Sequence, residues 1–150
     1  MRYLSDAHAL IWFVDQDHLL SPNAHSIMSN SANDLLLSAA TIREIGIKVG
    51  LQKLPLSMPF TQWMNKAIAD HGLVILPITV EYIDNQIGLP HHHRDPFDRI
   101  LASQAVVEGI PLLSKDATFD KYGVIRIWQK PAMHYVLSRK LIASPYNRSC

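Results

Sequence analysis

Short apolar runs alternate with longer segments of helical periodicity along the whole chain. The apolar runs, which we expect to be strands, cover residues 2–5, 35–38, 73–76, 110–114 and 124–128. The segments between them carry cap residues and apolar positions at helical spacing, which predicts helices over residues 7–13, 22–30, 39–49, 59–71, 79–87 and 95–109. Strands that alternate with helices predict a mostly parallel sheet covered by helices on both faces, so the fold class is α/β.

The most informative helix start lies at Arg94–Ala105. Asp95 is a good N-cap residue, and proline at position 96 suits the first helical position because its missing N–H has no partner there anyway. Asp98 then falls in the first turn, near the positive end of the helix dipole. Alanines at positions 102 and 105 share its face, which would let this helix approach other backbone closely.

Four carboxylates follow different predicted elements. Sites in parallel α/β sheets form at the carboxyl ends of the strands, where we expect Asp6, Glu44, Asp98 and Asp116 to converge. Each also has a purely structural reading. Asp6, Asp98 and Asp116 each stand at or near a helix start or turn, and Glu44 fits the third position of a capping box that begins at Thr41.

Four carboxylates at one edge of a sheet favour a bound cation. Two unit charges about 4 Å apart repel by about 4 kcal/mol at an effective dielectric constant of about 20. A hard divalent ion removes this penalty, and Mg²⁺ or Mn²⁺ prefers oxygen ligands. Such a site suits phosphodiester hydrolysis by a metal-activated water.

Four segments carry a family resemblance: Leu4–Trp12, Ser38–Lys48, His92–Arg99 and Leu112–Asp116. Together and in this order they resemble PIN-domain proteins, more narrowly the VapC-type toxins of type II toxin–antitoxin pairs, over about residues 1–128. The resemblance implies a three-layer α/β/α domain and an endoribonuclease that depends on Mg²⁺ or Mn²⁺. It also implies a homodimer inhibited by a small antitoxin.

The resemblance assigns the acidic quartet to particular positions. Asp6 and Asp98 would be the main metal ligands, and Glu44 and Asp116 would complete the site directly or through water. Asp95 matches the motif, but we assign it only the cap. Position 7 is usually Thr or Ser in this family and is alanine here, so a supporting hydroxyl is missing.

Two alternatives to an RNA-cutting toxin stay open. The same quartet would serve a DNA- or structure-specific nuclease of the same fold. Ala7 would also be consistent with a catalytically decayed binding module. The residues after Trp128 exceed the usual end of the domain, so residues 129–150 are expected to be a C-terminal extension and not a separate domain.

Composition limits the class further. Hydrophobic residues make up 48% of the 150 residues and charged ones 18%, which is typical of a globular domain. The net charge of +1 shows no basic footprint, so any RNA binding must use a local patch. The single cysteine, Cys150, fits a reducing compartment. Because we see neither a signal peptide nor an apolar run of membrane-spanning length, we expect a cytoplasmic protein that does not bind a membrane.

Other chemistry-bearing residues are weaker candidates. The run His91–His93 lacks the spacing of zinc ligands, so we expect a solvated or RNA-facing loop. Four cations are candidates for binding RNA phosphates, with Arg99 the first choice: Lys48, Lys53, Arg94 and Arg99. The aromatic residues Trp12, Phe13, Trp63 and Trp128 would stack on bases or, more simply, fill the core. Apolar positions in residues 7–30 and 59–71 would serve either the core or a partner groove.

Overall fold

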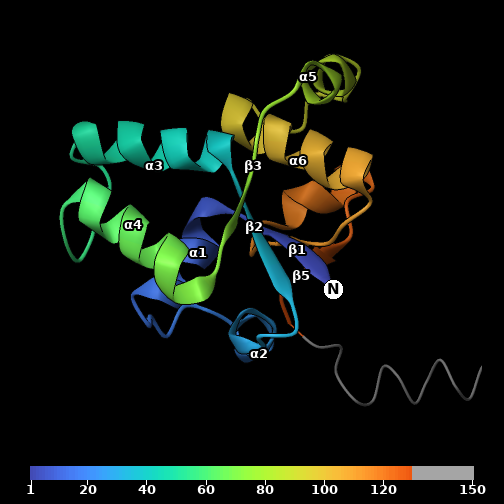
Figure 1. Ribbon diagram of the computed structural model, residues 1–150. Coiled ribbons are helices and arrows are strands. Elements are labelled where there is room, and N and C mark those ends of the chain that lie inside the picture. The colour runs from blue at the N-terminus through green and yellow to red at the C-terminus, as the bar shows by residue number, and fades with distance from the viewer. Residues whose placement is uncertain (130–150) are drawn as a thin grey trace, which may run out of the picture.

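The computed structural model describes residues 1–129, so the proposed extension lies outside the described residues except for Gln129. The elements follow one another in the order β1 (Arg2–Ser5), α1 (Ala7–Val14), α2 (Pro22–Ser29), β2 (Asp34–Ser38), α3 (Ala39–Gly50), α4 (Phe60–His71), β3 (Val74–Leu76), α5 (Val80–Ile87), α6 (Pro96–Glu108), β4 (Leu112–Leu113), η1 (Ala117–Tyr122) and β5 (Arg126–Ile127). Figure 1 shows their arrangement. Each predicted strand and helix is present, with shifted ends.

The sheet is parallel throughout and has the strand order β3-β2-β1-β4-β5. The central strand β1 pairs Tyr3 with Leu35 of β2 on one side and Ser5 with Leu113 of β4 on the other. Chain order therefore reverses beside β1, since β2 and β3 extend the sheet in one direction and β4 and β5 in the other. Such a reversal is where open α/β sheets place their ligand sites, at the carboxyl ends of the strands.

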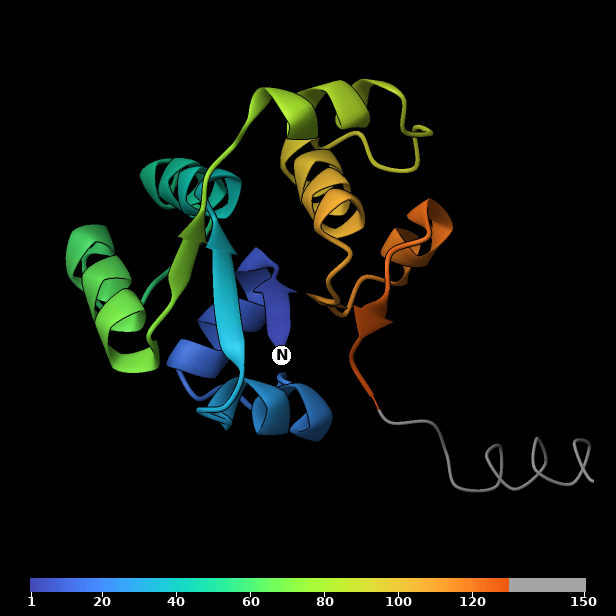
Figure 2. The ribbon, with the colours of Figure 1, turned by 45° about the vertical axis from the view of Figure 1, so that its right-hand side comes forward.

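Helices cover both faces of this sheet and form the predicted three layers. Alternate strand residues point to opposite faces: Leu4, Leu36 and Leu112 pack with α5, α6 and η1, whereas Tyr3, Leu35 and Leu113 pack with α1, α2 and α4. Figure 2 shows α4 and α6 on opposite sides of the strands. The α/β/α prediction is confirmed.

Element ends differ from the predictions where short-range sequence signals compete. Helices α4 and α6 end close to the predicted positions, and Gly72 and Gly109 follow them in the left-handed conformation. Gly50 is instead the last residue of α3. Strand β4 is only two residues long, because Pro111 has no N–H to donate to the ladder. The 3₁₀ helix η1 was not predicted, since six residues are too few to establish a period.

The apolar positions of α1, α2 and α4, for which both the core and a partner groove remained open, contribute to the core. Leu10, Trp63, Met64 and Ala67 belong to the buried cluster beneath these helices. Apolar side chains are instead exposed along β3 and α5: Val74, Ile75, Ile78, Val80, Ile83 and Ile87. Within residues 1–129, no helix combines the length and apolar character needed to cross a bilayer.

Candidate metal centre

The predicted carboxylates converge on one cavity of about 240 Å³ at the carboxyl ends of β1 and β4. Asp6 directly follows β1, and Asp116 directly precedes η1. Glu44 comes from the second turn of α3, and Asp98 from the first turn of α6. The remaining lining residues are Ala7, His8, Lys48, Asp95 and Phe119.

Three of these acids also cap helices. The Oδ1 atoms of Asp6, Asp95 and Asp116 accept hydrogen bonds from the N–H groups of Ala9 (2.8 Å), Phe97 (2.7 Å) and Thr118 (2.9 Å), respectively. Asp6 and Asp116 therefore do have the capping role that the sequence suggested. Since a carboxylate has a second oxygen, capping does not prevent these acids from facing the cavity.

Glu44 has no capping role. Helix α3 begins at Ala39 with Ser38 as its N-cap, so the capping box predicted at Thr41 does not form. The Glu44 side chain is only 6% exposed, and its Oε1 lies 3.6 Å from Nζ of Lys48. Helix α3 therefore contributes the buried carboxylate of Glu44 and the neighbouring cation of Lys48 to the site.

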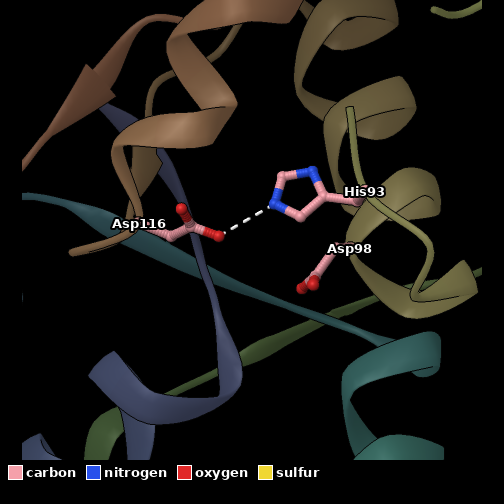
Figure 3. Close-up of side chains that lie close together, drawn as sticks. All are labelled: His93, Asp98 and Asp116. Atoms are coloured by element: carbon pink, nitrogen blue, oxygen red, sulfur yellow. Dashed lines mark hydrogen bonds and ion pairs between the residues drawn. The ribbon is translucent and has the colours of Figure 1, made fainter. Parts of the chain in front are cut away.

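Potential ligand atoms form two overlapping groups. One oxygen each of Glu44, Asp95 and Asp98 lie within 4.8 Å of one another, and so do one ligand atom each of His93, Asp98 and Asp116. Asp98 belongs to both groups, and Figure 3 shows its carboxylate beside the contact between His93 and Asp116. Asp6 lines the same cavity but belongs to neither group.

Mutual repulsion and burial are visible in the pKa values. Burial, and after it the charge of Asp95, raises the pKa of Asp98 to about 6, with smaller contributions from Glu44 and Asp116 and an opposing one from His93. Burial also raises the pKa of Glu44 against the opposing effect of Lys48. The cavity therefore contains several carboxylates whose ionisation is disfavoured without an added cation.

Asp6 and Asp116 meet at the fully buried Ser114. Burial raises the pKa of Asp6, while a hydrogen bond with the Ser114 side chain lowers it. The Oγ of Ser114 accepts the N–H of Asp116 at 3.1 Å. Ser114 thus supplies a hydroxyl next to Asp6, where Ala7 has none.

His93 was missed as a site residue. Its side chain is 9% exposed, and its Nε2 lies 2.8 Å from Oδ2 of Asp116. The prediction of a solvated loop is wrong for His93, although His91 and His92 are exposed. Sequence spacing could not reveal this, because the partner is 23 residues away.

Assigning only the cap to Asp95 was also incomplete. It caps α6 as predicted, yet it lines the cavity and belongs to the group with Glu44 and Asp98. The spacing Asp95-Pro96-Phe97-Asp98 contained the available signal, because both acids stand at the same helix start.

The choice of Arg99 as the best phosphate-binding residue is wrong. Arg99 is 8% exposed, and its guanidinium donates to the carbonyls of Gln86 (2.9 Å), Leu89 (3.3 Å) and Pro90 (2.8 Å). It therefore joins α6 to the C-terminal end of α5. Lys48 lines the acidic cavity, whereas Arg94 and Lys53 are exposed outside its lining.

Most of the candidate stacking residues are core. Phe13, Trp63 and Trp128 are all less than 9% exposed. Trp12 is partly buried and, together with Lys115, lines a second hollow of about 300 Å³ that shares Asp6, His8 and Asp116 with the acidic cavity. Only Trp12 among these four keeps a position beside the site.

The donor set fits a hard divalent ion. Five carboxylates from α3, the start of α6, the end of β1 and the segment between β4 and η1 face one cavity, and oxygen donors are what Mg²⁺ and Mn²⁺ prefer. Both groups of three potential ligands found among residues 1–129 lie here. A larger hollow of about 990 Å³ between α1, α2 and α4 contains neither group.

Comparison with known proteins places the chain in a family. The PIN domain family model matches residues 3–125, so the protein belongs to the PIN-domain family. No curated protein shows a significant match over the chain.

Solved structures share the fold at low sequence identity. VapBC2 from Rickettsia felis bound to a DNA fragment from its promoter has a TM-score of 0.64 and 14% identity, covering 86% of this chain and all of the other. FitAB bound to an IR36 DNA fragment has 0.61 and 16%, covering 88% and 99%. VapBC-5 from Mycobacterium tuberculosis, a member of the VapBC family of toxin–antitoxin systems, has 0.52 and 14%, covering 84% and 98%. These similarities concern the fold alone.

Proposed function

We propose that this protein is a divalent-metal-dependent endoribonuclease and the toxin of a type II toxin–antitoxin pair. One observation carries the proposal: the carboxylates of Asp6, Glu44, Asp95, Asp98 and Asp116 line one cavity at the topological switch point of a PIN fold. The nuclease domain would comprise residues 1–128.

Asp98 would be the central ligand, because it belongs to both groups of potential ligand atoms. Asp6, which lines the same cavity from the end of β1, would be the other main ligand, and Glu44, Asp95 and Asp116 would complete the site directly or through water. When bound, Mg²⁺ or Mn²⁺ activates water and neutralises charge on the phosphate oxygens. Lys48 lowers the negative potential of the cavity, which favours the approach of a phosphodiester.

The proposed reaction leaves a 5′-phosphate and a 3′-hydroxyl. Water oxygen forms the new bond to phosphorus, the bond from phosphorus to O3′ breaks, and a proton ends on O3′. Single-stranded or loop RNA is the substrate we favour, since an unpaired strand can reach a site of this size.

The partner assignment rests on the family resemblance and on the fold shared with toxin–antitoxin complexes. We propose a small antitoxin partner and a homodimer. The exposed apolar side chains of β3 and α5 provide a surface for association. Sedimentation of the purified chain, alone and with the product of a short neighbouring reading frame, tests both.

The function is tested with purified protein on a mixed RNA and DNA pool in the presence of Mg²⁺ or Mn²⁺. Wild type, Asp98→Asn and Asp84→Asn are compared; Asp84 is an exposed acid of α5 outside the cavity. We expect RNA cleavage by wild type and Asp84→Asn only. Equal cleavage by Asp98→Asn would refute the proposed site, and preferential cleavage of DNA would identify the alternative nuclease.

Ala7 gives the decayed-module alternative a specific test. Ala7 lines the cavity without a hydroxyl, while Ser114 supplies one beside Asp6. Calorimetric titration with Mn²⁺ separates the two functions: a functional site binds the ion, whereas a decayed site does not.

A further inference from the structure

We propose that His93 is a positioning residue that joins Asp116 to the loop leading into α6. It would hold Asp116 and Asp98 at a spacing suited to one cation. The inference rests on the proposed metal-dependent function. Its residues come from two segments, the loop before α6 and the segment from β4 to η1 (Figure 3).

His93 contacts the second segment at several points. Its Nε2 lies 2.8 Å from Oδ2 of Asp116, its backbone N–H donates to the hydroxyl of Tyr122 at 2.9 Å, and its Nδ1 lies 3.0 Å from the same hydroxyl. The ring also stacks on Tyr122 at an interplanar angle of 10° and packs against Phe119. A side chain packed against two aromatic rings and contacted at both ring nitrogens has a fixed orientation.

The hydroxyl of Tyr122 decides which ring nitrogen carries the proton. Because its oxygen already accepts the N–H of His93, its own proton is available for Nδ1. In the neutral ring, Nδ1 is then the acceptor and Nε2 carries the hydrogen. This tautomer would donate from Nε2 to Oδ2 of Asp116, and these two atoms lie 2.8 Å apart.

The contact between His93 and Asp116 opposes the electrostatic repulsion between Asp98 and Asp116. Asp98 and Asp116 belong to separate segments, and one carboxylate oxygen of each lies within 4.8 Å of the other. Without a connection, repulsion between the two carboxylates favours their separation. The contact between Nε2 of His93 and Oδ2 of Asp116 stabilises the ionised carboxylate in this position.

Mn²⁺ affinity is the most direct measurement. Calorimetry on the full chain compares wild type, His93→Leu, His93→Gln and Tyr122→Phe, with His91→Leu as the matched exposed control. We expect His93→Leu to bind Mn²⁺ about 10- to 100-fold more weakly, the range typical of residues that orient ligands. His93→Gln restores most of the affinity because its amide N–H can donate to Asp116, and Tyr122→Phe falls between the two.

Electron paramagnetic resonance tests the competing role, in which His93 is itself a ligand of the metal. Our proposal predicts no nitrogen coupling to bound Mn²⁺ in the wild type. Such coupling, together with a His93→Gln variant as weak as His93→Leu, would overturn the positioning role. Wild-type affinity in His93→Leu would overturn it as well.

The metal-free protein provides an independent readout. Long-range ¹H–¹⁵N spectra identify the protonated ring nitrogen, and we expect Nε2 in the wild type with loss of this preference in Tyr122→Phe. A ring with its hydrogen on Nδ1 alone could not donate to Asp116 and would contradict the positioning role. Failure of the proposed function looks different, because the wild type then binds no Mn²⁺ while the Nε2 tautomer persists.

Discussion

Asp98 and Arg99 are neighbours at the start of α6, yet their charges are treated in opposite ways. Arg99 points toward the end of α5, where three carbonyl oxygens accept its N–H groups and the negative end of that helix favours a cation. Asp98 points into the cavity, where burial and then the charges of Asp95, Glu44 and Asp116 raise its pKa. Two consecutive residues of one helical turn thus carry a buried charge with hydrogen-bond partners and a charge without them among residues 1–129.

Arg99 is a buried charge that stabilises the fold, whereas Asp98 is a partly buried charge that is available to a ligand. A buried cation with hydrogen-bond acceptors on all sides stabilises the contact between two helices and has no capacity left for a ligand. Carboxylates gathered with too little positive charge lower stability until a cation arrives. Candidate functional residues in this fold are therefore wholly or partly buried charged side chains that lack enough opposite charge or hydrogen-bond partners.

The largest effect is expected for Asp98→Asn. We predict a loss of RNA cleavage of about 10²- to 10³-fold, comparable to removal of a key electrostatic group from an active site. The metal-free variant should be more stable than wild type, since the amide removes a disfavoured charge. Cleavage rates and urea unfolding measure the two changes; a variant that loses both activity and stability would contradict this side of the comparison.

Arg99→Met tests the opposite side of the same turn. We expect unfolding to become easier by about 3 kcal/mol, because carbonyls of Gln86, Leu89 and Pro90 lose a charged donor. Arg94→Met, which changes the exposed arginine just before α6, should stay within about 0.5 kcal/mol of wild type. Urea denaturation gives both values, and an unchanged Arg99→Met would show that the contact is not stabilising.

The pH dependence of stability should also follow from Asp98. Its folded pKa, about 6, lies above the ordinary value of 3.8, so the folded state holds the proton more tightly. Stability of the metal-free protein should therefore fall as pH rises from about 4 to about 6, by at most about 3 kcal/mol from this group. Asp116, whose pKa is lowered, acts in the opposite direction. Thermal unfolding across this range should show a weaker fall for Asp98→Asn.

Asp95→Asn should have the smallest effect. Asparagine keeps the cap of α6, while loss of the charge weakens the group formed with Glu44 and Asp98. We expect cleavage to fall by about tenfold or less, comparable to loss of a residue that supports metal ligands. Asp95→Ala should in addition lower stability by about 1 kcal/mol. If Asp95→Asn were as inactive as Asp98→Asn, Asp95 would be a principal ligand.

Much of the fold could be predicted because local signals agree with the tertiary arrangement. Asp95, Pro96 and Gly109 define the ends of α6, and buried strands such as Leu35–Ser38 appear as continuous apolar runs. The convergence of Asp6, Glu44, Asp98 and Asp116 followed from the rule that parallel strands end at one edge.

The rest depended on contacts between distant segments. Arg99 and His93 each find their partners across loops, so neither the burial of the first nor the placement of the second follows from spacing. Asp95 showed its cap locally, but its proximity to Glu44 requires α3 and α6 to pack together. Sequence patterns define elements, and the packing of elements decides which charges are compensated.

Thermal unfolding with and without Mn²⁺ tests the central claim most directly. If the carboxylates around Asp98 bind a divalent cation, the free energy of unfolding of the wild type should rise by about 2.7 kcal/mol at an ion concentration of about 100 times Kd. Its Tm should then rise by several degrees. Asp98→Asn should show little or no rise under the same conditions, while Asp84→Asn responds like the wild type. An unresponsive wild type, or an equal rise in Asp98→Asn, would contradict the account.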